Sequence, residues 1–240
     1  MRPKHDIAIF LLARSGSKRL PNKHFHKLTS VYTAIEYCIK RLKKSKKVKK
    51  IILCTTKKKE DDKFKNICSK HKIQIFRGSE KNVLKRVIDC AKDNSIKTVV
   101  RITGDCPLID PQIIDKCINL HFKKKSDYTT NTLKLSFPDG LDVEVINLNS
   151  LIKSQKYSKN KYNKEHVTPY IRKSKIFKKQ NLKNPKNYSN RRWTLDDYED
   201  LIFIKKAVKY FSSNFYFSWK DLIKAEKIKK SLVNIKKRTS

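Results

Sequence analysis

The sequence has 240 residues, and its 59 Lys and Arg against 22 Asp and Glu give a formal net charge of +37 at pH 7. A chain of this length suits one large α/β domain or two small ones. No stretch reaches the roughly 18 to 20 consecutive apolar residues that a membrane span needs, and the apolar run at residues 7–13 is too short for a secretory signal. We therefore expect a cytoplasmic protein that does not enter the membrane.

The first half of the chain alternates short apolar runs with amphipathic stretches. The runs predict strands at residues 7–13, 51–55, 73–76 and 98–103. The stretches have helical spacing at residues 31–42, 61–71, 83–91 and 111–122. Repeated strand–helix units favour an α/β fold, with a mostly parallel sheet and helices on both of its faces.

The second half is less regular. Strands are predicted at residues 127–132, 141–146 and 192–194, and helices at residues 149–156, 164–173, 198–211 and from 218 onward. The polar stretch at residues 178–190 is predicted to be an exposed loop. We expect a single domain whose later half carries a substrate-binding or dimer-forming extension.

Glycine is rare, and its positions are informative. The four glycines are Gly16, Gly78, Gly104 and Gly140, and all lie at predicted strand ends or turns. In doubly wound sheets, ligands bind outside the carboxyl ends of the strands, so three of these glycines indicate a binding crevice. The alternative is that they only allow tight turns.

The loop after the first strand, residues 13–23, combines backbone donors with cations. Ser15-Gly16-Ser17 would let N–H groups converge on an anion, and Arg14, Arg19 and Lys23 add three positive charges. A triphosphate and its leaving pyrophosphate require such a cradle, although a basic surface loop would have the same composition. The spacing differs from a P-loop, and a Gly-x-Gly-x-x-Gly motif is absent.

The positive charge itself is weak evidence for nucleic-acid binding. Of the basic residues, 48 are Lys and 11 are Arg, whereas nucleic-acid readers favour Arg. Because the lysines are spread over every segment, we interpret them as a solvated surface whose field attracts polyanionic substrates. The six cysteines show no metal-binding spacing and are expected to be buried thiols.

The first loop resembles the signature of the sugar cytidylyltransferases, which make CMP-activated acidic sugars. The closest likeness is to the branch labelled spore-coat polysaccharide biosynthesis or acylneuraminate cytidylyltransferase-like. Five further segments resemble that branch in order: FRGSE at 76–80, VRITGDCPLIDP at 100–111, FPDGLDVEV at 137–145, EHVTPY at 165–170 and RWTLD at 192–196. The likeness spans roughly residues 7–205.

The resemblance implies a three-layer, Rossmann-like nucleotide-diphospho-sugar transferase fold and a homodimer. It divides the chain into a nucleotide-binding half at about 1–125, a sugar-binding and dimerisation half at about 126–217 and a helical tail at 218–240. The sequence departs from the family pattern at Asn22 and at residues 29–32 and 197–198. These departures leave the shape of the first loop and the substrate open.

The resemblance also implies roles for individual residues. Catalysis would depend on Arg14, Lys23 and Asp105. The nucleotide would be bound by Ala13, Arg14, Ser15, Gly16, Ser17, Arg19, Lys23, Arg77, Gly78, Ser79, Thr103 and Asp105. The sugar would be bound by Asp139, Asp142, Glu144, Glu165, His166 and Arg192, and Asp105 and Asp196 would hold Mg²⁺.

Three of these assignments have a local alternative. A carboxylate at a strand end, beside Gly104, suits a hard cation that bridges phosphates; the alternative is that Asp105 is an N-cap or turn residue. Asp196 could cap the helix predicted at 198–211. His166 could act as a base, a hydrogen-bond donor or a structural cap.

The function expected from the resemblance is transfer of CMP from CTP to an acidic sugar, a nonulosonic acid or a relative of one, for surface polysaccharide synthesis. A sugar oxygen would attack the α-phosphorus in line, and pyrophosphate would leave. One alternative is a nucleotidyltransferase that uses a sugar or alditol phosphate with CTP or UTP. The other is a basic protein that binds RNA or another polyanion.

Overall fold

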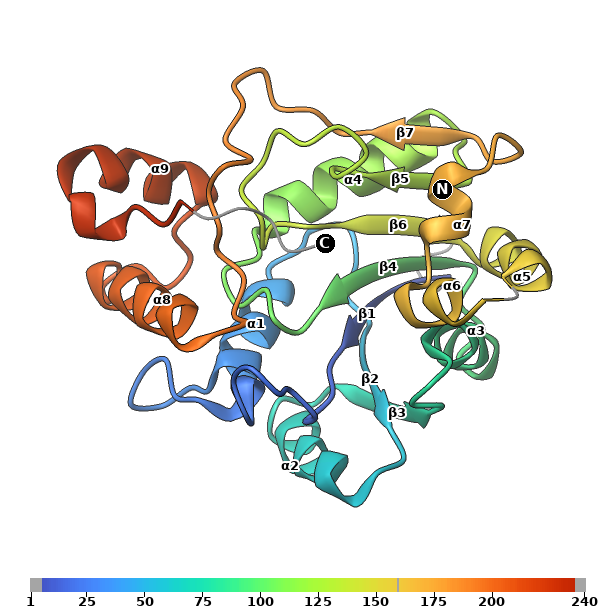
Figure 1. Ribbon diagram of the computed structural model, residues 1–240, viewed down its shortest axis with the longest axis horizontal. Coiled ribbons are helices and arrows are strands. Elements are labelled where there is room, and N and C mark those ends of the chain that lie inside the picture. The colour runs from blue at the N-terminus through green and yellow to red at the C-terminus, as the bar shows by residue number, and fades with distance from the viewer. Residues whose placement is uncertain (1–5, 159, 236–240) are drawn as a thin grey trace.

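Seven strands form one mixed sheet in the order β3-β2-β1-β4-β6-β5-β7 (Figure 1). The computed structural model describes residues 6–158 and 160–235. The strands are β1 (Ile7–Leu12), β2 (Ile51–Thr56), β3 (Gln74–Gly78), β4 (Thr98–Thr103), β5 (Tyr128–Thr130), β6 (Glu144–Asn147) and β7 (Lys179–Asn181). Strands β1 to β4 are parallel, β6 runs against β4 and β5, and β7 is parallel to β5. The predicted mostly parallel sheet is therefore confirmed.

Helices cover both faces of the sheet. One core contains side chains of α1 (Ala34–Leu42), α2 (Lys63–Lys70), α4 (Pro111–Lys123), α8 (Tyr198–Tyr210) and α9 (Trp219–Ile228). The other contains side chains of α3 (Val83–Asp93), α5 (Leu148–Tyr157) and α7 (Pro169–Lys173), and α6 (Lys161–His166) contacts α3 on the same side. Short 3₁₀ helices lie at η1 (Lys23–Phe25), η2 (Lys59–Asp62) and η3 (Lys230–Leu232).

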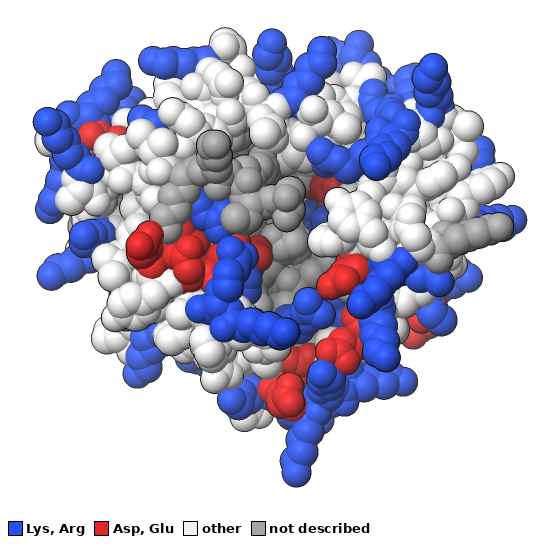
Figure 2. All heavy atoms as spheres, in the orientation of Figure 1, with Lys and Arg blue, Asp and Glu red and all other residues white. Residues whose placement is uncertain are grey.

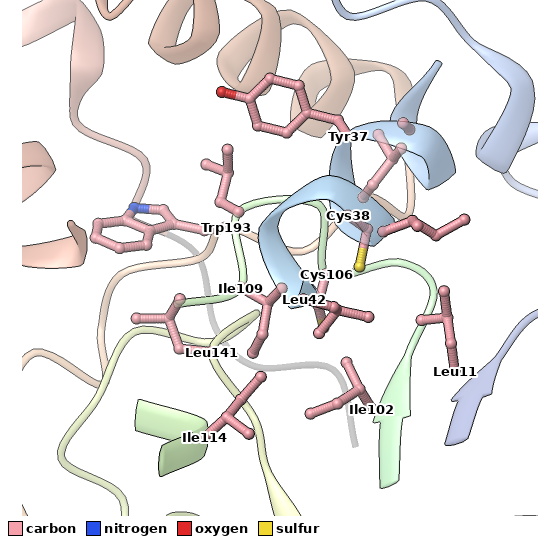
Figure 3. Packing of buried hydrophobic residues seen from close by; sticks show 14 of the residues in the cluster. Leu11, Tyr37, Cys38, Leu42, Ile102, Cys106, Ile109, Ile114, Leu141 and Trp193 are labelled. Carbon is pink, nitrogen blue, oxygen red and sulfur yellow. The ribbon is translucent and has the colours of Figure 1, made fainter. Parts of the chain in front are cut away.

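The first strand shows why the sequence forms this three-layer structure. Alternate residues of β1 enter the two cores: Ile9 and Leu11 the first, and Ala8, Phe10 and Leu12 the second. A strand that is buried on both faces has a continuous run of apolar residues in its sequence. Figure 3 shows Leu11 and the β4 residue Ile102 beside α1 in the first core.

Several predicted boundaries are wrong for identifiable reasons. Helix α1 begins at Ala34 because Thr33 and Glu36 form a capping box, which leaves Val31 outside the helix and exposed. The helix predicted at 164–173 is two helices, because Val167 has a φ of 69° and Pro169 starts α7. Strands β5 and β6 are also shorter than predicted.

The last strand of the sheet lies where a loop was predicted. Residues Lys179–Asn181 form β7 and pair with β5, although they show no apolar pattern. Residues 192–194 form no strand, and only Arg192 makes an isolated bridge, with Asp139. The edge position explains the error, because an edge strand can remain polar.

Two other features of the described residues agree with the sequence. All six cysteines are buried free thiols, as expected. Within residues 6–158 and 160–235, no helix is long and apolar enough to cross a membrane.

Gly140 is the glycine whose conformation the fold requires. Its φ is +98°, and a Cβ there would lie 2.6 Å from the Trp193 carbonyl carbon and 2.8 Å from the Thr194 nitrogen. The turn before β6 thus packs directly on the backbone of residues 193 and 194. A side chain would force these two segments apart.

We expect Gly140→Ala to lower the free energy of unfolding by about 2 to 4 kcal/mol, because it adds both backbone strain and a backbone clash. Gly16→Ala is the matched control, since a Cβ there meets nothing within 4 Å. Urea denaturation of both variants measures the difference. Equal unfolding midpoints would contradict this account of Gly140.

Candidate active site

The candidate site lies where β1 and β4 end. The two strands pair from Ile7–Thr98 to Leu12–Thr103, and the Gly104 N–H donates to the Leu12 carbonyl at 2.8 Å. This pairing places the predicted residues Ala13, Thr103 and Asp105 at one edge of the sheet. A Cβ on Gly104 would lie 3.0 Å from side-chain atoms of Ala13, His24 and Ile35, so the close approach of the loops depends on this glycine.

Lys23 lies between the two predicted magnesium ligands, Asp105 and Asp196. Its Nζ lies 3.0 Å from Asp105 Oδ2 and 2.9 Å from Asp196 Oδ1. Burial would lower the pKa of the Lys23 ammonium, but the charges of the two carboxylates hold that pKa above its ordinary value. The structure therefore brings the first loop, the end of β4 and the loop before α8 together around one charged lysine.

Asp105 is ionised in this arrangement. Burial would raise the pKa of its carboxyl, yet the Lys23 ammonium and a hydrogen bond from Thr103 hold that pKa well below its usual range. The neighbouring His24 behaves oppositely, since burial and the Lys23 charge lower its pKa to about 4. At neutral pH the imidazole is thus uncharged and does not compete with Lys23 for the carboxylates.

Asp196 is held by two further cations. Arg19 Nη2 lies 3.3 Å from Asp196 Oδ2, and Arg192 Nη2 lies 2.7 Å from the same oxygen. The buried Asp200 pairs with Arg192 at 3.3 Å and accepts the backbone N–H of Asp196 at 3.0 Å. Asp200, which the sequence analysis did not identify, therefore holds both Arg192 and the backbone of Asp196 in place.

Arg192 and Asp139, two of the predicted sugar-binding residues, are both buried. The Arg192 guanidinium is 2% exposed and pairs with Asp139 at 3.3 Å. Both groups are engaged within the protein, where they support Asp196 and the turn at Gly140. Their direct contact with a sugar stays a prediction.

Two backbone N–H groups of the first loop already donate hydrogen bonds within the protein. The Ser15 N–H donates to Asp61 at 2.7 Å, and the Ser17 N–H donates to the Ser15 carbonyl at 2.8 Å. The predicted cradle of backbone N–H groups is therefore smaller than the Ser-Gly-Ser pattern indicates. The cationic side chains of Arg14, Arg19 and Lys23 remain as the main attraction for phosphate.

Asp61 positions this loop. It is 2% exposed and also accepts hydrogen bonds from Thr55 Oγ1 at 2.9 Å and from the Thr56 hydroxyl. Burial would raise the pKa of Asp61, but these hydrogen bonds lower it, so it stays ionised. The sequence analysis missed Asp61; three consecutive acids at 60–62 in a lysine-rich chain were the available signal.

The loop after β3 is tied to the loop after β2. Arg77 donates to the carbonyls of Thr56 at 2.9 Å and Lys58 at 2.8 Å, and its guanidinium pairs with Asp62 at 2.5 Å. Gly78 is closely covered, because a Cβ there would lie 2.7 Å from Arg86 Cγ. Ser79 Oγ accepts the Asn82 N–H at 3.0 Å. These nucleotide-binding candidates lie at the same edge as Ala13, two strands away.

A pocket lies next to the site, beside Thr103. It has a volume of about 380 Å³ and is lined by Arg101, Thr103, Asp142, Glu144, His166 and Arg172, among others. Three predicted sugar-binding residues, Asp142, Glu144 and His166, thus line one cavity next to Thr103. Glu165 lies outside it and pairs with Arg14 at 3.5 Å, which connects the first loop to α6.

Glu144 organises this pocket. Its carboxylate accepts hydrogen bonds from Tyr128 at 2.5 Å, from Thr168 at 2.7 Å and from Arg101. Burial would raise its pKa, but Arg101 and the hydroxyl donors lower it. Arg172, which sequence reasoning missed, donates to Thr132 Oγ1 at 2.8 Å and faces the same cavity.

In Figure 2 acidic and basic side chains lie side by side near the centre of this face, whereas mostly Lys and Arg project along the outline of the molecule. The carboxylates of Asp105 and Asp196 are oxygen ligands of the kind that Mg²⁺ prefers. Among the described residues, no group of three or more His, Cys, Asp and Glu could hold a metal ion. The pair fits a magnesium ion only if phosphate oxygens and water complete its coordination, which is the usual arrangement in nucleotide enzymes.

A sheet that brings a cationic loop and ionised carboxylates to the carboxyl ends of its strands is typical of a protein that binds a phosphorylated ligand there. Comparison with known proteins gives the family: residues 8–237 match the cytidylyltransferase family. The chain belongs to this family and is therefore a nucleotidyltransferase.

Individual relatives agree. The uncharacterized protein MJ1063 of Methanocaldococcus jannaschii is 40% identical over 83% of this chain and 82% of its own length. The spore coat polysaccharide biosynthesis protein SpsF of Bacillus subtilis is 34% identical over 84% of this chain and 85% of its own. A solved cytidylyltransferase from Leptospira borgpetersenii superposes with a TM-score of 0.92 at 32% identity, covering 98% of this chain and 99% of the other. The resemblance to this family and the expected fold are confirmed.

We expect Asp61→Asn to raise the KM for CTP about tenfold with a smaller effect on kcat, because the first loop loses its buried tether. The control is Glu60→Gln, which changes a neighbouring acid whose backbone carbonyl, not its side chain, contacts Ser15. Steady-state kinetics gives both constants, and a thermal melt shows how much of each variant is folded. A normal KM for CTP in folded Asp61→Asn would contradict the positioning role.

Proposed function

We propose that the protein transfers CMP from CTP to an acidic sugar, such as a nonulosonic acid, and releases pyrophosphate. Membership of the cytidylyltransferase family supports the use of CTP. The similarity to a spore coat polysaccharide biosynthesis protein supports a role in surface polysaccharide synthesis. The observation that carries the proposal is the Lys23 ammonium shared by Asp105 and Asp196 at the ends of β1 and β4.

Different residues would serve the leaving pyrophosphate and the metal ion. An acceptor oxygen forms a bond to the α-phosphorus of CTP while the bond from that phosphorus to the leaving pyrophosphate breaks. Arg14, Arg19 and Lys23 neutralise the charge that develops on the pyrophosphate. Asp105 and Asp196 would hold Mg²⁺, which supplies further charge neutralisation at the phosphates when it is bound.

For phosphate and metal to bind here, the Lys23 ammonium and the carboxylates of Asp105 and Asp196 would move slightly apart. In the structure Lys23 Nζ lies within 3.0 Å of both carboxylates. A phosphate that enters the crevice competes for the same ammonium, because it is the least exposed cation of the loop. Lys23 would then bind phosphate while the carboxylates take up the metal.

The pocket beside Thr103 supports an anionic acceptor. It contains two arginines, and the side chain of Arg172 is 32% exposed. Arg172 Nη1 already donates to Tyr128 and to Thr132 Oγ1, and Nη2 donates to the Thr132 carbonyl at 2.7 Å, so its remaining N–H groups are those that could bind a carboxylate or phosphate. The same chemistry would suit a sugar or alditol phosphate, which is the second candidate acceptor.

We also propose that the enzyme uses Mg²⁺, forms a homodimer and works in the cytoplasm. The resemblance of the site motifs to the sugar cytidylyltransferases supports the first two properties. The third is an expectation from the sequence, in which no apolar stretch is long enough to span a membrane.

Pyrophosphate release in the presence of each NTP, Mg²⁺ and a panel of acidic sugars and sugar phosphates tests the proposed reaction. We expect release with CTP that falls about 10²- to 10³-fold in Lys23→Ala and in Asp105→Asn, because each removes a charge from the phosphate site. Lys18→Ala, in the same loop and exposed, is the matched control and should retain activity. Turnover within threefold of the native rate in both site variants would remove the catalytic assignment, and selectivity for UTP would favour the second candidate.

Arg172→Gln tests the acceptor pocket separately. We expect the KM for the acidic acceptor to rise at least about tenfold while the KM for CTP stays within about twofold, since one charge-assisted contact is lost on one substrate only. Arg172→Lys should restore part of the affinity by returning the charge without the planar fork. A parallel rise in both KM values would show that Arg172 supports the fold and not the acceptor.

A further inference from the structure

The connections at the edge of the sheet opposite the candidate active site are rich in lysine. Every strand of the sheet except the antiparallel β6 begins at that edge. Five connections lead into them from helices: residues 43–50, 71–73, 94–97, 124–127 and 174–178. Half of these 24 residues are Lys, with one Asp and no Arg. We call this surface the basic edge.

The active-site edge has a different composition. The connections that leave the strand ends there, at residues 13–33, 57–62, 79–82, 104–110, 131–143 and 182–197, contain ten Lys and four Arg against ten acidic residues. A compositional preference for lysine in the whole chain would enrich both edges equally. The near absence of acids at the basic edge therefore needs another explanation.

Helix termini account for only part of it. A cation in the last turn of a helix interacts favourably with the helix dipole, and this effect is lost beyond that turn. Helix α1 already ends with Lys40 and Arg41 in its last turn. The six lysines between Lys43 and Lys50 follow the helix, and five of them are exposed. Lys43, Lys49 and Lys50 donate hydrogen bonds to backbone carbonyls, but like charges placed this close along the chain repel one another.

The composition favours a lipid surface over a nucleic acid. Readers of nucleic acids use Arg forks and aromatic rings that stack on bases. The basic edge has no Arg, and Phe177, its one aromatic residue, is buried. Lysine is a strongly hydrated point charge on a flexible stem, which suits a diffuse array of anionic headgroups.

A groove opens on the same edge. It has a volume of about 970 Å³, and Lys47, Lys97 and Lys125 line it together with Ser126. The hydroxyl of Ser126 is buried without a hydrogen-bond partner among the described residues. The acids beside it are engaged, since Asp6 pairs with Lys97 at 3.1 Å and Asp127 accepts the Lys178 N–H at 2.8 Å. The groove thus lies within a surface whose lysines outnumber its acids.

We propose that the basic edge docks the protein on a bilayer that contains anionic phospholipid. Electrostatic attraction to the headgroups holds it there without insertion of any segment. Because the strands place the two edges at opposite ends of the sheet, the candidate active site faces away from the bilayer and stays open to its substrates. This proposal does not depend on which nucleotide or sugar the enzyme uses.

Vesicle co-sedimentation of the full chain, without CTP, tests the proposal. The native protein should bind phosphatidylcholine vesicles that contain phosphatidylglycerol and should not bind pure phosphatidylcholine. In the edge variant Lys46, Lys47, Lys72, Lys124, Lys125 and Lys175 are replaced by Gln; all are exposed. We expect about 100-fold weaker binding to the anionic vesicles, with unchanged turnover of CTP.

The matched control replaces six exposed lysines of α8 and α9, Lys205, Lys206, Lys209, Lys220, Lys224 and Lys227, by Gln, so that both variants have the same net charge. It should bind the anionic vesicles within about threefold of the native protein. Equal losses in the two variants would show attraction by net charge alone and overturn the proposal. Failure of the native protein to bind anionic vesicles, or its displacement by single-stranded RNA at a lower phosphate concentration than that of the lipid, would also overturn it.

Discussion

The ammonium of Lys23, held between Asp105 and Asp196, is the contact on which the candidate site depends. Two carboxylates in a half-buried crevice repel each other, and one of them would take up a proton or turn to solvent without a cation between them. Lys23 supplies that cation, and Arg19 and Arg192 balance the remaining charge on Asp196. The site is therefore ionised and ordered before any ligand binds, so its groups need little rearrangement to meet a polyphosphate.

This contact exists because of the order of the strands. Pairing of β1 with β4 brings the first loop beside Gly104 and Asp105, although long stretches of chain separate them. The neighbouring β2 adds Asp61, whose carboxylate holds the Ser15 N–H of the first loop. Each phosphate-facing group is thus supported by a different strand end, which explains how a loop with little regular structure can have one defined conformation.

The same arrangement separates the charges of the molecule. Connections that leave the strands at the active-site edge carry ten acids against fourteen bases, and ion pairs there position the predicted catalytic groups. Connections that enter the strands at the opposite edge contain twelve Lys and one Asp, and the ion pair of Lys97 with Asp6 lies there. A protein with a large net charge can in this way keep charges of both signs at its active-site edge.

The sequence by itself determined the strand–helix alternation, the first four strands and the loop after β1, because apolar periodicity and rare glycines are local properties. It also indicated Lys23 and Asp105, but it could not join them, since the two contacts of Lys23 link residues 82 and 173 positions apart. Only the tertiary structure decided that polar residues 179–181 form a strand, that Asp61 and Asp200 support the site, and that lysines scattered along the chain share one edge. Strand pairing and ion pairs between distant segments arise when the whole sheet packs, and no local pattern records them.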